Sequence, residues 1–531
     1  MTSVAVLQES SVVAPAAEPV SRQRLQLRTV AVVGVWLVFL GLATQIWLRR
    51  NHPFVPFADH ALLEMQLRDL ATHPPTLGAY SRFGWHHPGP LATYLIGVIY
   101  WATGGYSVSM WIAGAFLNAA ACTAVVCVAF RRLDTWRALG ACAVLGVYLV
   151  YLGPLGLTDP WNPIVSILPF LAFILCCWDA WCGGRWGWLA IVAFGSFALQ
   201  SHLQYAAPVA CCVVATIGAT GWQHRRAVQW RSIAPVAGSA IALAGVVWAL
   251  PIGNQLWGSG NMHGIVRYVT RGSGPQHAWR DSADFAAREV VAPLRALAPG
   301  GRINVLLQWP APSRGLLVMT ALVLVVTTTL AIRHRSRDGL ALLALGSLVW
   351  VSAVVQCTRM ERELWPYLVA WISALFVVAG VAVITVIPGV VARVSLRYPR
   401  VQRGLAVTLW IGVALVVSAA PWRPLTATTT VGPLAVAARP QLPFRGAILV
   451  TDGGAPVTMQ LSSLVSIWVR DGFDVRVPND NALIFGARTI GAREAILRLQ
   501  LVVVDPAAPL PEIPNATPFA SAGTLALYRI A

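Results

Sequence analysis

The stretch SVSMWIAGAFLNAAACTAVVCVAF, residues 107–130, contains no charged residue and is followed directly by Arg131 and Arg132. About 20 apolar residues in a helix span the hydrocarbon core of a bilayer and satisfy their own backbone hydrogen bonds there. Further stretches of this kind lie at 29–48, 137–157, 163–181, 186–201, 205–221, 232–251, 313–332, 339–357, 366–391 and 404–420. We therefore predict an α-helical polytopic membrane protein with about eleven transmembrane helices.

The composition of the whole chain agrees with this prediction. Hydrophobic residues make up 57% of the 531 residues, charged residues 11%, and the mean hydropathy is +0.64. These values exclude an ordinary soluble domain. The stretch at 29–48 is too long for the apolar region of a signal peptide, so we expect it to stay in the membrane. Residues 1–28 then form a cytoplasmic tail, and residues 29–420 form the transmembrane domain.

The net charge of +18 comes from arginine, because all 39 basic residues are arginine. The arginines gather in short segments between apolar stretches: Arg22, Arg24 and Arg28; Arg131, Arg132 and Arg137; Arg225, Arg226 and Arg231; Arg333, Arg335 and Arg337; Arg393, Arg397, Arg400 and Arg403. Such clusters are typical of cytoplasmic loops and not of a nucleic-acid interface. We predict a plasma-membrane protein with a cytoplasmic N-terminus and no nucleic-acid partner.

The apolar segment at 88–104 is an exception to the count. If it crossed the membrane fully, Arg131 and Arg132 would lie outside and every later cluster would be inverted. We therefore predict an interfacial or re-entrant helix there.

The composition changes after residue 420, which predicts a small extracytoplasmic α/β domain at 421–531. The pattern favours strands at 447–452, 475–478, 482–485 and 501–505, and helices at 457–470 and 492–499. The first of these strands ends at Asp452, before Gly453 and Gly454.

Polar segments on the predicted outer side carry the groups suited to chemistry: 51–87, 158–163, 200–205, 358–365 and a longer loop at 252–312. In the first, Asp59 follows a span and is placed to act as a base at the membrane surface. Capping of the helix that begins near His60 is the alternative. We assign Glu64, in the same helix, to donor or acceptor binding.

The remainder of the first loop offers further binding groups. Tyr80 and Arg82 suit a sugar and a phosphate, with a place in the aromatic belt as the alternative for the rings. His86 and His87 precede a stiff Pro-Gly-Pro turn and could bind a donor phosphate or a metal. Anchoring of that turn is the alternative.

The other outer segments add candidates of three kinds. Asp159, with Trp161 and Asn162, provides a second acid, and helix capping is its alternative. Gln200, His202 and Gln204 lie at the junction of two predicted spans. Unpaired polar groups at membrane depth are costly, so these side chains are expected to line a cavity or to form a hydrogen-bonded turn. One of Arg359 and Arg362 could hold a phosphate, unless both pair with the neighbouring glutamates.

These features together resemble a known superfamily. An aspartate after the first span, His87-Pro88-Gly89-Pro90-Leu91 before a juxtamembrane helix, and a span ending in Arg131-Arg132-Leu133 follow one another. This order is similar to the GT-C superfamily of membrane glycosyltransferases, in particular its protein mannosyltransferase and lipid A aminoarabinose transferase branch. That branch commonly has His-Pro-Pro-Leu-Tyr-Tyr, so the match here is loose in spacing. The segments Trp161-Asn162-Pro163 and Gln200-Ser201-His202 are also similar to segments of actinobacterial members.

The resemblance implies a glycosyltransferase in which Asp59 is the first-loop catalytic aspartate and Asp159 the second-loop acid. The donor would be a polyprenyl-phosphate sugar, with arabinofuranose or mannose as the sugar for an actinobacterial member. The acceptor would be a cell-envelope glycan or lipid, and the configuration would invert. Phosphate is a good leaving group, so no cofactor or metal is required, although a divalent cation could take part.

Two other classes of function remain open from the sequence. A transporter or flippase of lipid-linked envelope precursors would also need polar groups at membrane depth, but is expected to have acids or broken helices near the midplane. A non-catalytic partner in envelope assembly would tolerate substitution of Asp59. The sequence does not identify the sugar, the linkage, the acceptor, the oligomeric state or the role of the C-terminal domain.

Overall fold

The computed structural model describes residues 22–52, 54–224, 230–271, 276–295, 314–361, 364–387, 399–424, 426, 430–452, 458–491 and 494–531. Several residues considered above lie outside the described ones: the tail up to residue 21, Arg225, Arg226, Arg362, Arg393, Arg397, Gly453 and Gly454.

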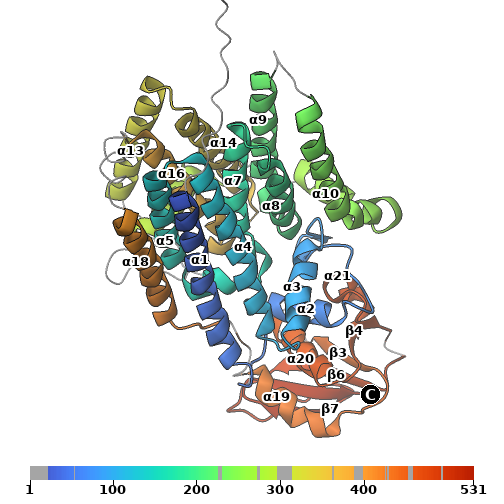
Figure 1. Cartoon of the computed structure of the whole chain (residues 1–531). Coiled ribbons are helices and arrows are strands. Elements are labelled where there is room, and N and C mark those ends of the chain that lie inside the picture. The colour runs from blue at the N-terminus through green and yellow to red at the C-terminus, as the bar shows by residue number, and fades with distance from the viewer. Residues whose placement is uncertain are drawn as a thin grey trace, which may run out of the picture.

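A bundle of long helices forms the larger part of the molecule (Figure 1). Its helices are α1 (Arg22–Leu48), α4 (Ser109–Arg132), α5 (Thr135–Thr158), α7 (Ile167–Trp181), α8 (Gly187–Ser201), α9 (Ala206–His224), α10 (Trp230–Trp257), α13 (Arg314–Arg333), α14 (Arg337–Arg359), α16 (Leu375–Val386) and α18 (Pro399–Ala419). Among the described residues, ten helical segments are long and apolar enough to cross a membrane. The remaining predicted span corresponds to α8, which is apolar but has only 15 residues. The prediction of a polytopic helical membrane protein is confirmed.

The helix α7 lies at the centre of the bundle. Every residue from Ile167 to Ala180 is buried, as expected for a helix that is apolar on all sides. By contrast, α13 exposes large apolar side chains such as Leu322 and Val325 on its outer surface. This is the distribution of a bundle whose outer helices face lipid.

Basic residues join the helices at one end of the bundle. The Arg132 guanidinium donates to the Asp338 carboxylate at 2.7 Å, and the Trp178 indole N–H donates to the same oxygen at 3.1 Å. Arg131 forms an ion pair with the buried Asp179. The C-terminal sheet lies at the opposite end (Figure 1), as the prediction from the arginine clusters requires.

Two short helices lie at the end of the bundle that carries the C-terminal sheet. They are α2 (Asp59–Arg68) and α3 (Leu91–Ala102), which pack against each other (Figure 1). With 12 residues, α3 is too short to cross a bilayer. It exposes Val98 and Trp101, so it matches the predicted interfacial or re-entrant helix.

The C-terminal region is a small α/β domain, as predicted. Its six-stranded sheet has the order β5-β4-β3-β6-β8-β7. The strands are β3 (Ile448–Asp452), β4 (Val475–Pro478), β5 (Thr489–Ile490), β6 (Leu497–Val503), β7 (Ala516–Ala522) and β8 (Leu525–Ile530). β5, β4, β3 and β6 are parallel, whereas β8 pairs antiparallel with both of its neighbours, β6 and β7. The helices α19 (Val431–Ala438) and α20 (Thr458–Arg470) complete its core.

Two elements expected in this domain are wrong. The predicted strand at 482–485 is a helical turn, α21 (Ala482–Phe485), because it directly follows the 3-10 turn Asn479–Asn481. The helix predicted at 492–499 overlaps β6, in which Leu497, Leu499 and Leu501 are buried and alternate with more exposed residues. This period of two places the leucines on one face of the sheet, and it outweighs the helix propensity of the segment.

The contact between α1 and α18 gives a test of the packing. A Cβ atom at Gly34 would overlap the indole of Trp410, whereas one at Gly412, in α18, would meet no atom within 4 Å. We expect Gly34→Ala to destabilise the protein by about 1–3 kcal/mol through overpacking. Thermal unfolding of the purified protein in detergent measures this, with Gly412→Ala as the matched control. Equal melting temperatures for the two variants would contradict the observed packing.

Candidate active site

A cleft opens where α2, α3, the second polar segment and the C-terminal domain meet. Residues along its wall include Asp59, Tyr80, Ile96, Trp161, Asn162 and Ile484. Three of the polar segments identified in the sequence therefore share one cleft, together with α21 of the C-terminal domain.

Asp59 is the first residue of α2 and its side chain is exposed in the cleft. The Trp161 indole N–H donates to Asp59 Oδ2 at 2.7 Å. A negative side chain in the first turn is also favoured by the helix dipole. Ala58 occupies the N-cap position and no side chain caps this helix, so capping does not account for Asp59. The result is an oriented carboxylate that remains accessible to a substrate.

A buried pair lies directly behind Asp59. His60 Nε2 and Asp159 Oδ1 are 2.6 Å apart, and the two residues are only 4% and 2% exposed. Burial alone would lower the pKa of His60, but the charge and hydrogen bond of Asp159, with the charge of Asp59, raise it above its ordinary value of 6.5. The His60 ring also stacks on Trp111, with centroids 4.9 Å apart.

Trp161 connects this pair to Asp59. Its backbone N–H donates to Asp159 Oδ1 at 2.9 Å, while its indole N–H holds Asp59. The indole ring packs against Tyr367, with centroids 4.6 Å apart. The next residue, Asn162, donates to the Ser201 carbonyl at 3.2 Å. Asp159 thus fixes the turn that places the Trp161 ring, whereas the short helix α6 (Asn162–Val165) that follows has no side-chain cap.

Tyr80 and Arg82 come from the hairpin of β1 (Tyr80–Ser81) and β2 (Trp85–His86). Tyr80 lines the cleft, and burial together with the Asp59 charge raises the pKa of its hydroxyl. The hydroxyl is therefore a hydrogen-bond donor at neutral pH. Arg82 is exposed, and its guanidinium lies over the Phe83 ring at 5.1 Å. A cation near the cleft can meet a phosphate.

The structure places His87 and His202 away from the cleft surface. Their rings lie 4.3 Å apart, and His87 Nδ1 accepts a hydrogen bond from the Leu203 N–H at 3.1 Å. Burial lowers the pKa of both, that of His202 to about 3, so both rings are neutral. This geometry matches the anchoring role considered for His87 in the sequence analysis.

The remaining polar side chains of this region mainly hold backbone segments together. Gln200 Oε1 accepts from the Leu91 N–H at 3.3 Å, and its Nε2 donates to the Val247 carbonyl at 2.7 Å. His86 exchanges two backbone hydrogen bonds with the Asn261 amide, each 2.8 Å long. Gln204 is half-buried, and its Oε1 has no partner among the described residues.

Two further candidates, Glu64 and Arg359, do not line the cleft. Glu64 is completely buried, with its carboxylate engaged by several donors. Arg359 is exposed at the end of α14, and Arg362 lies outside the described residues. Within the described ranges, no group of three His, Cys, Asp or Glu side chains is arranged to hold a metal ion.

His60 is the residue of this site that the sequence analysis did not select. Its partner Asp159 is 99 positions away, and nothing local in the sequence indicates the pairing. The sequence predicts one acid from each loop, Asp59 and Asp159, but it indicates only the start of a helix at His60.

The fold of this chain is similar to that of solved structures. No family model and no curated protein matches the sequence. The structure is similar to that of ArnT from Cupriavidus metallidurans in the apo state, with a TM-score of 0.55 and 14% identity over 94% of this chain and 98% of that chain. ArnT from Cupriavidus metallidurans bound to undecaprenyl phosphate gives a TM-score of 0.53 and 14% identity over 93% and 98%. The chain therefore shares the ArnT fold over nearly its whole length.

The His60–Asp159 pair predicts a pH-dependent contribution to stability. Because the pKa of His60 is raised in the folded state, the ionic contribution is complete below the unfolded pKa and is lost as the pH rises through the folded pKa. We expect Asp159→Asn to lower the melting temperature more at about pH 5.5 than at about pH 9. Thermal unfolding at both pH values measures this, with the exposed Asp281→Asn as control. A destabilisation that grows with pH would contradict the assignment.

Proposed function

We propose that this chain is a membrane glycosyltransferase that transfers a sugar from a polyprenyl-phosphate donor to a cell-envelope glycan or lipid. The observation that carries the proposal is the accessible Asp59 carboxylate, held by Trp161 in a cleft beside the short apolar helix α3. The shared ArnT fold supports it, since ArnT is a membrane glycosyltransferase of the GT-C kind.

The position of the cleft suits a donor that is anchored in lipid. The exposed apolar residues Leu95, Val98 and Trp101 suit α3 to the membrane surface. A polyprenyl chain could then remain in the bilayer while its phosphate and sugar reach Asp59. The ArnT structure bound to undecaprenyl phosphate supports a donor of this class.

The residues of the cleft fit an inverting transfer. Asp59 accepts the proton of the acceptor hydroxyl as its oxygen attacks the anomeric carbon. The bond between that carbon and the phosphate oxygen breaks, and the electron pair leaves with polyprenyl phosphate. Arg82 and the Tyr80 hydroxyl offer a positive charge and a hydrogen-bond donor for the charge that moves to the phosphate. The His60–Asp159 pair holds the turn that orients Asp59.

The specific substrates follow from the resemblance noted in the sequence. Arabinofuranose or mannose is our proposed sugar, and the acceptor is proposed to lie on the extracytoplasmic side. The arginine-rich end of the bundle, opposite the cleft, supports this orientation. The carboxylate of the cleft, Asp59, lies at an end of the bundle and not near its middle, which favours a transferase over a transporter.

Substitution of Asp59 tests the proposal. Asp59→Asn should lower the transfer rate at least about a hundredfold, because a general base contributes roughly 10²–10⁴. Purified protein in lipid would be supplied with radiolabelled polyprenyl-phosphate sugars and envelope-derived acceptors. The control is Asp281→Asn, which removes another exposed carboxylate from the first turn of a helix, α12 (Trp279–Arg295).

Two outcomes would argue against the proposal. Equal activity of the Asp59→Asn and wild-type proteins would exclude Asp59 as the base. Absence of transfer by the wild type with every donor in the panel would count against a polyprenyl-phosphate glycosyltransferase.

A further inference from the structure

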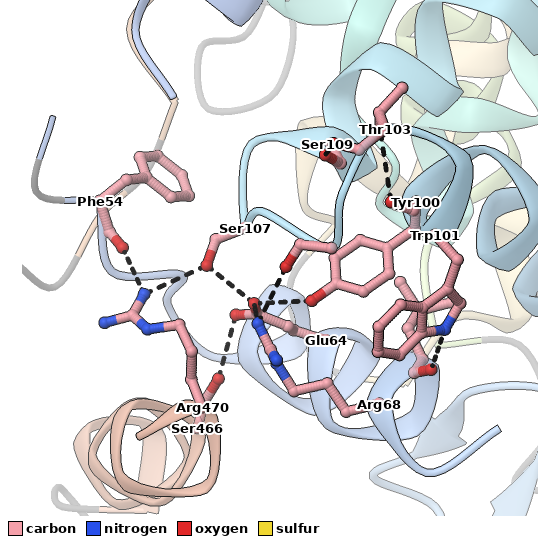
Figure 2. Close-up of polar contacts among 12 residues, drawn as sticks. Phe54, Glu64, Arg68, Tyr100, Trp101, Thr103, Ser107, Ser109, Ser466 and Arg470 are labelled. Atoms are coloured by element: carbon pink, nitrogen blue, oxygen red, sulfur yellow. Dashed lines mark hydrogen bonds and ion pairs between the residues drawn. The ribbon is translucent and has the colours of Figure 1, made fainter. Parts of the chain in front are cut away.

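Glu64 lies one and a half turns along α2 from Asp59 and is the centre of a buried polar network (Figure 2). Its side chain is 0% exposed. Glu64 Oε1 accepts hydrogen bonds from Arg68 at 3.0 Å, Tyr100 at 3.1 Å and Ser107 at 2.7 Å. Glu64 Oε2 accepts one from Ser466 at 3.2 Å.

These donors come from four different segments of the chain. Arg68 belongs to α2 itself, Tyr100 to α3, Ser107 to the connection before α4, and Ser466 to α20 of the C-terminal domain. The network therefore joins the helix of Asp59 to both neighbouring membrane-domain segments and to a domain more than 400 positions away, since Glu64 and Ser466 are separated by 402 residues.

Arg470 extends the network at the same interface. Its guanidinium donates to the Ser107 hydroxyl at 3.2 Å and to the Phe54 carbonyl at 3.1 Å, in the segment that leads to α2 (Figure 2). One turn before Ser466 on α20, the Ser462 hydroxyl donates to the Met459 carbonyl of its own helix at 2.8 Å and also lies 3.4 Å from the Ala58 carbonyl. The C-terminal domain thus contacts the residue directly before Asp59.

Apolar packing reinforces these polar contacts. Val55 and Met65 belong to the hydrophobic core of the C-terminal domain, and Phe57 and Leu62 pack against that core. A helix of ten residues is not stable by itself in water, so α2 depends on this packing for its position. The C-terminal domain therefore provides much of the support for α2.

We propose that Glu64 is a positioning residue that fixes α2, and with it Asp59, against the C-terminal domain. The catalytic part of this inference rests on the proposed function. Glu64 does not touch the cleft, and its four donors leave it no free role toward a substrate. The C-terminal domain accordingly forms part of the active site, which Ile484 in the cleft wall also indicates.

Because of the way the donors are arranged, two substitutions of Glu64 can distinguish a positioning role from a role of its charge in catalysis. In Glu64→Gln the amide oxygen can keep the three donors of Oε1. The new NH₂ group can donate to the Ser466 hydroxyl, which accepts as well as donates. The amide therefore retains the network without the charge, whereas Glu64→Ala removes it and leaves the buried donors without a partner.

The first experiment measures transfer by these variants with the donor that the wild type uses. We expect Glu64→Ala to lower kcat by about a hundredfold, with little change in KM, as misplacement of a catalytic group does. Glu64→Gln should stay within about tenfold of the wild type, since it retains the hydrogen bonds. The control is Glu494→Ala, which removes an exposed glutamate of the C-terminal domain. Equal losses for the alanine and glutamine variants, or none for alanine, would overturn the inference.

A second experiment decides the inference even if no sugar is transferred. Hydrogen–deuterium exchange of the full-length protein in lipid nanodiscs reports the stability of residues 59–68 directly. Exchange in α2 should be faster in Glu64→Ala and in Ser466→Ala, and close to wild type in Glu64→Gln and Glu494→Ala. Unchanged exchange in both Glu64→Ala and Ser466→Ala would overturn the inference, while a failed transfer assay alone would count only against the proposed function.

Discussion

A bilayer offers no hydrogen bonds to a polypeptide, and this constraint arranges the whole molecule. Backbone groups are satisfied within helices, and most ion pairs are confined to the ends of the bundle. Arginine side chains such as Arg132 bind acids at one end, while Asp159 and Glu64 find their partners at the other. The ion pairs of the bundle therefore gather at its two ends, and the cleft with Asp59 lies at one of them.

The cleft is built from segments that cannot hold their shape independently. α2 has ten residues, α3 has 12 and the hairpin β1–β2 has two residues in each strand. Buried polar side chains supply the missing support: Gln200 satisfies the start of α3, and Glu64 joins α2 to α3 and α20. Many of the polar residues around the site thus hold backbone segments together, and a smaller number, such as Asp59 and Tyr80, line the cleft.

The sequence was informative where the physical signal is local. Long apolar stretches predicted the bundle, and the arginine clusters predicted that α3 does not cross. Asp59 and Asp159 were selected because each lies in a polar segment that follows a predicted span on the outer side. The pairing of His60 with Asp159 and of Glu64 with Ser466 depends on contacts across 99 and 402 positions, which no local pattern encodes. The first part of β6 was predicted as a helix because local propensity and the alternation of Leu497, Leu499 and Leu501 disagree, whereas its second part overlaps the strand predicted at 501–505.

The separation of Glu64 from Ser466 along the chain also has a consequence for biogenesis. The loop that carries Asp59 is synthesised early, with the first spans, together with Tyr100 and Ser107. The partners from the C-terminal domain, Ser466 and Arg470, are synthesised only after the last span. During translation this loop therefore lacks its C-terminal partners until the C-terminal domain has been synthesised and folded. Assembly of the cleft is thereby coupled to completion of the polypeptide, so a partly inserted chain would present the cleft in an unassembled form.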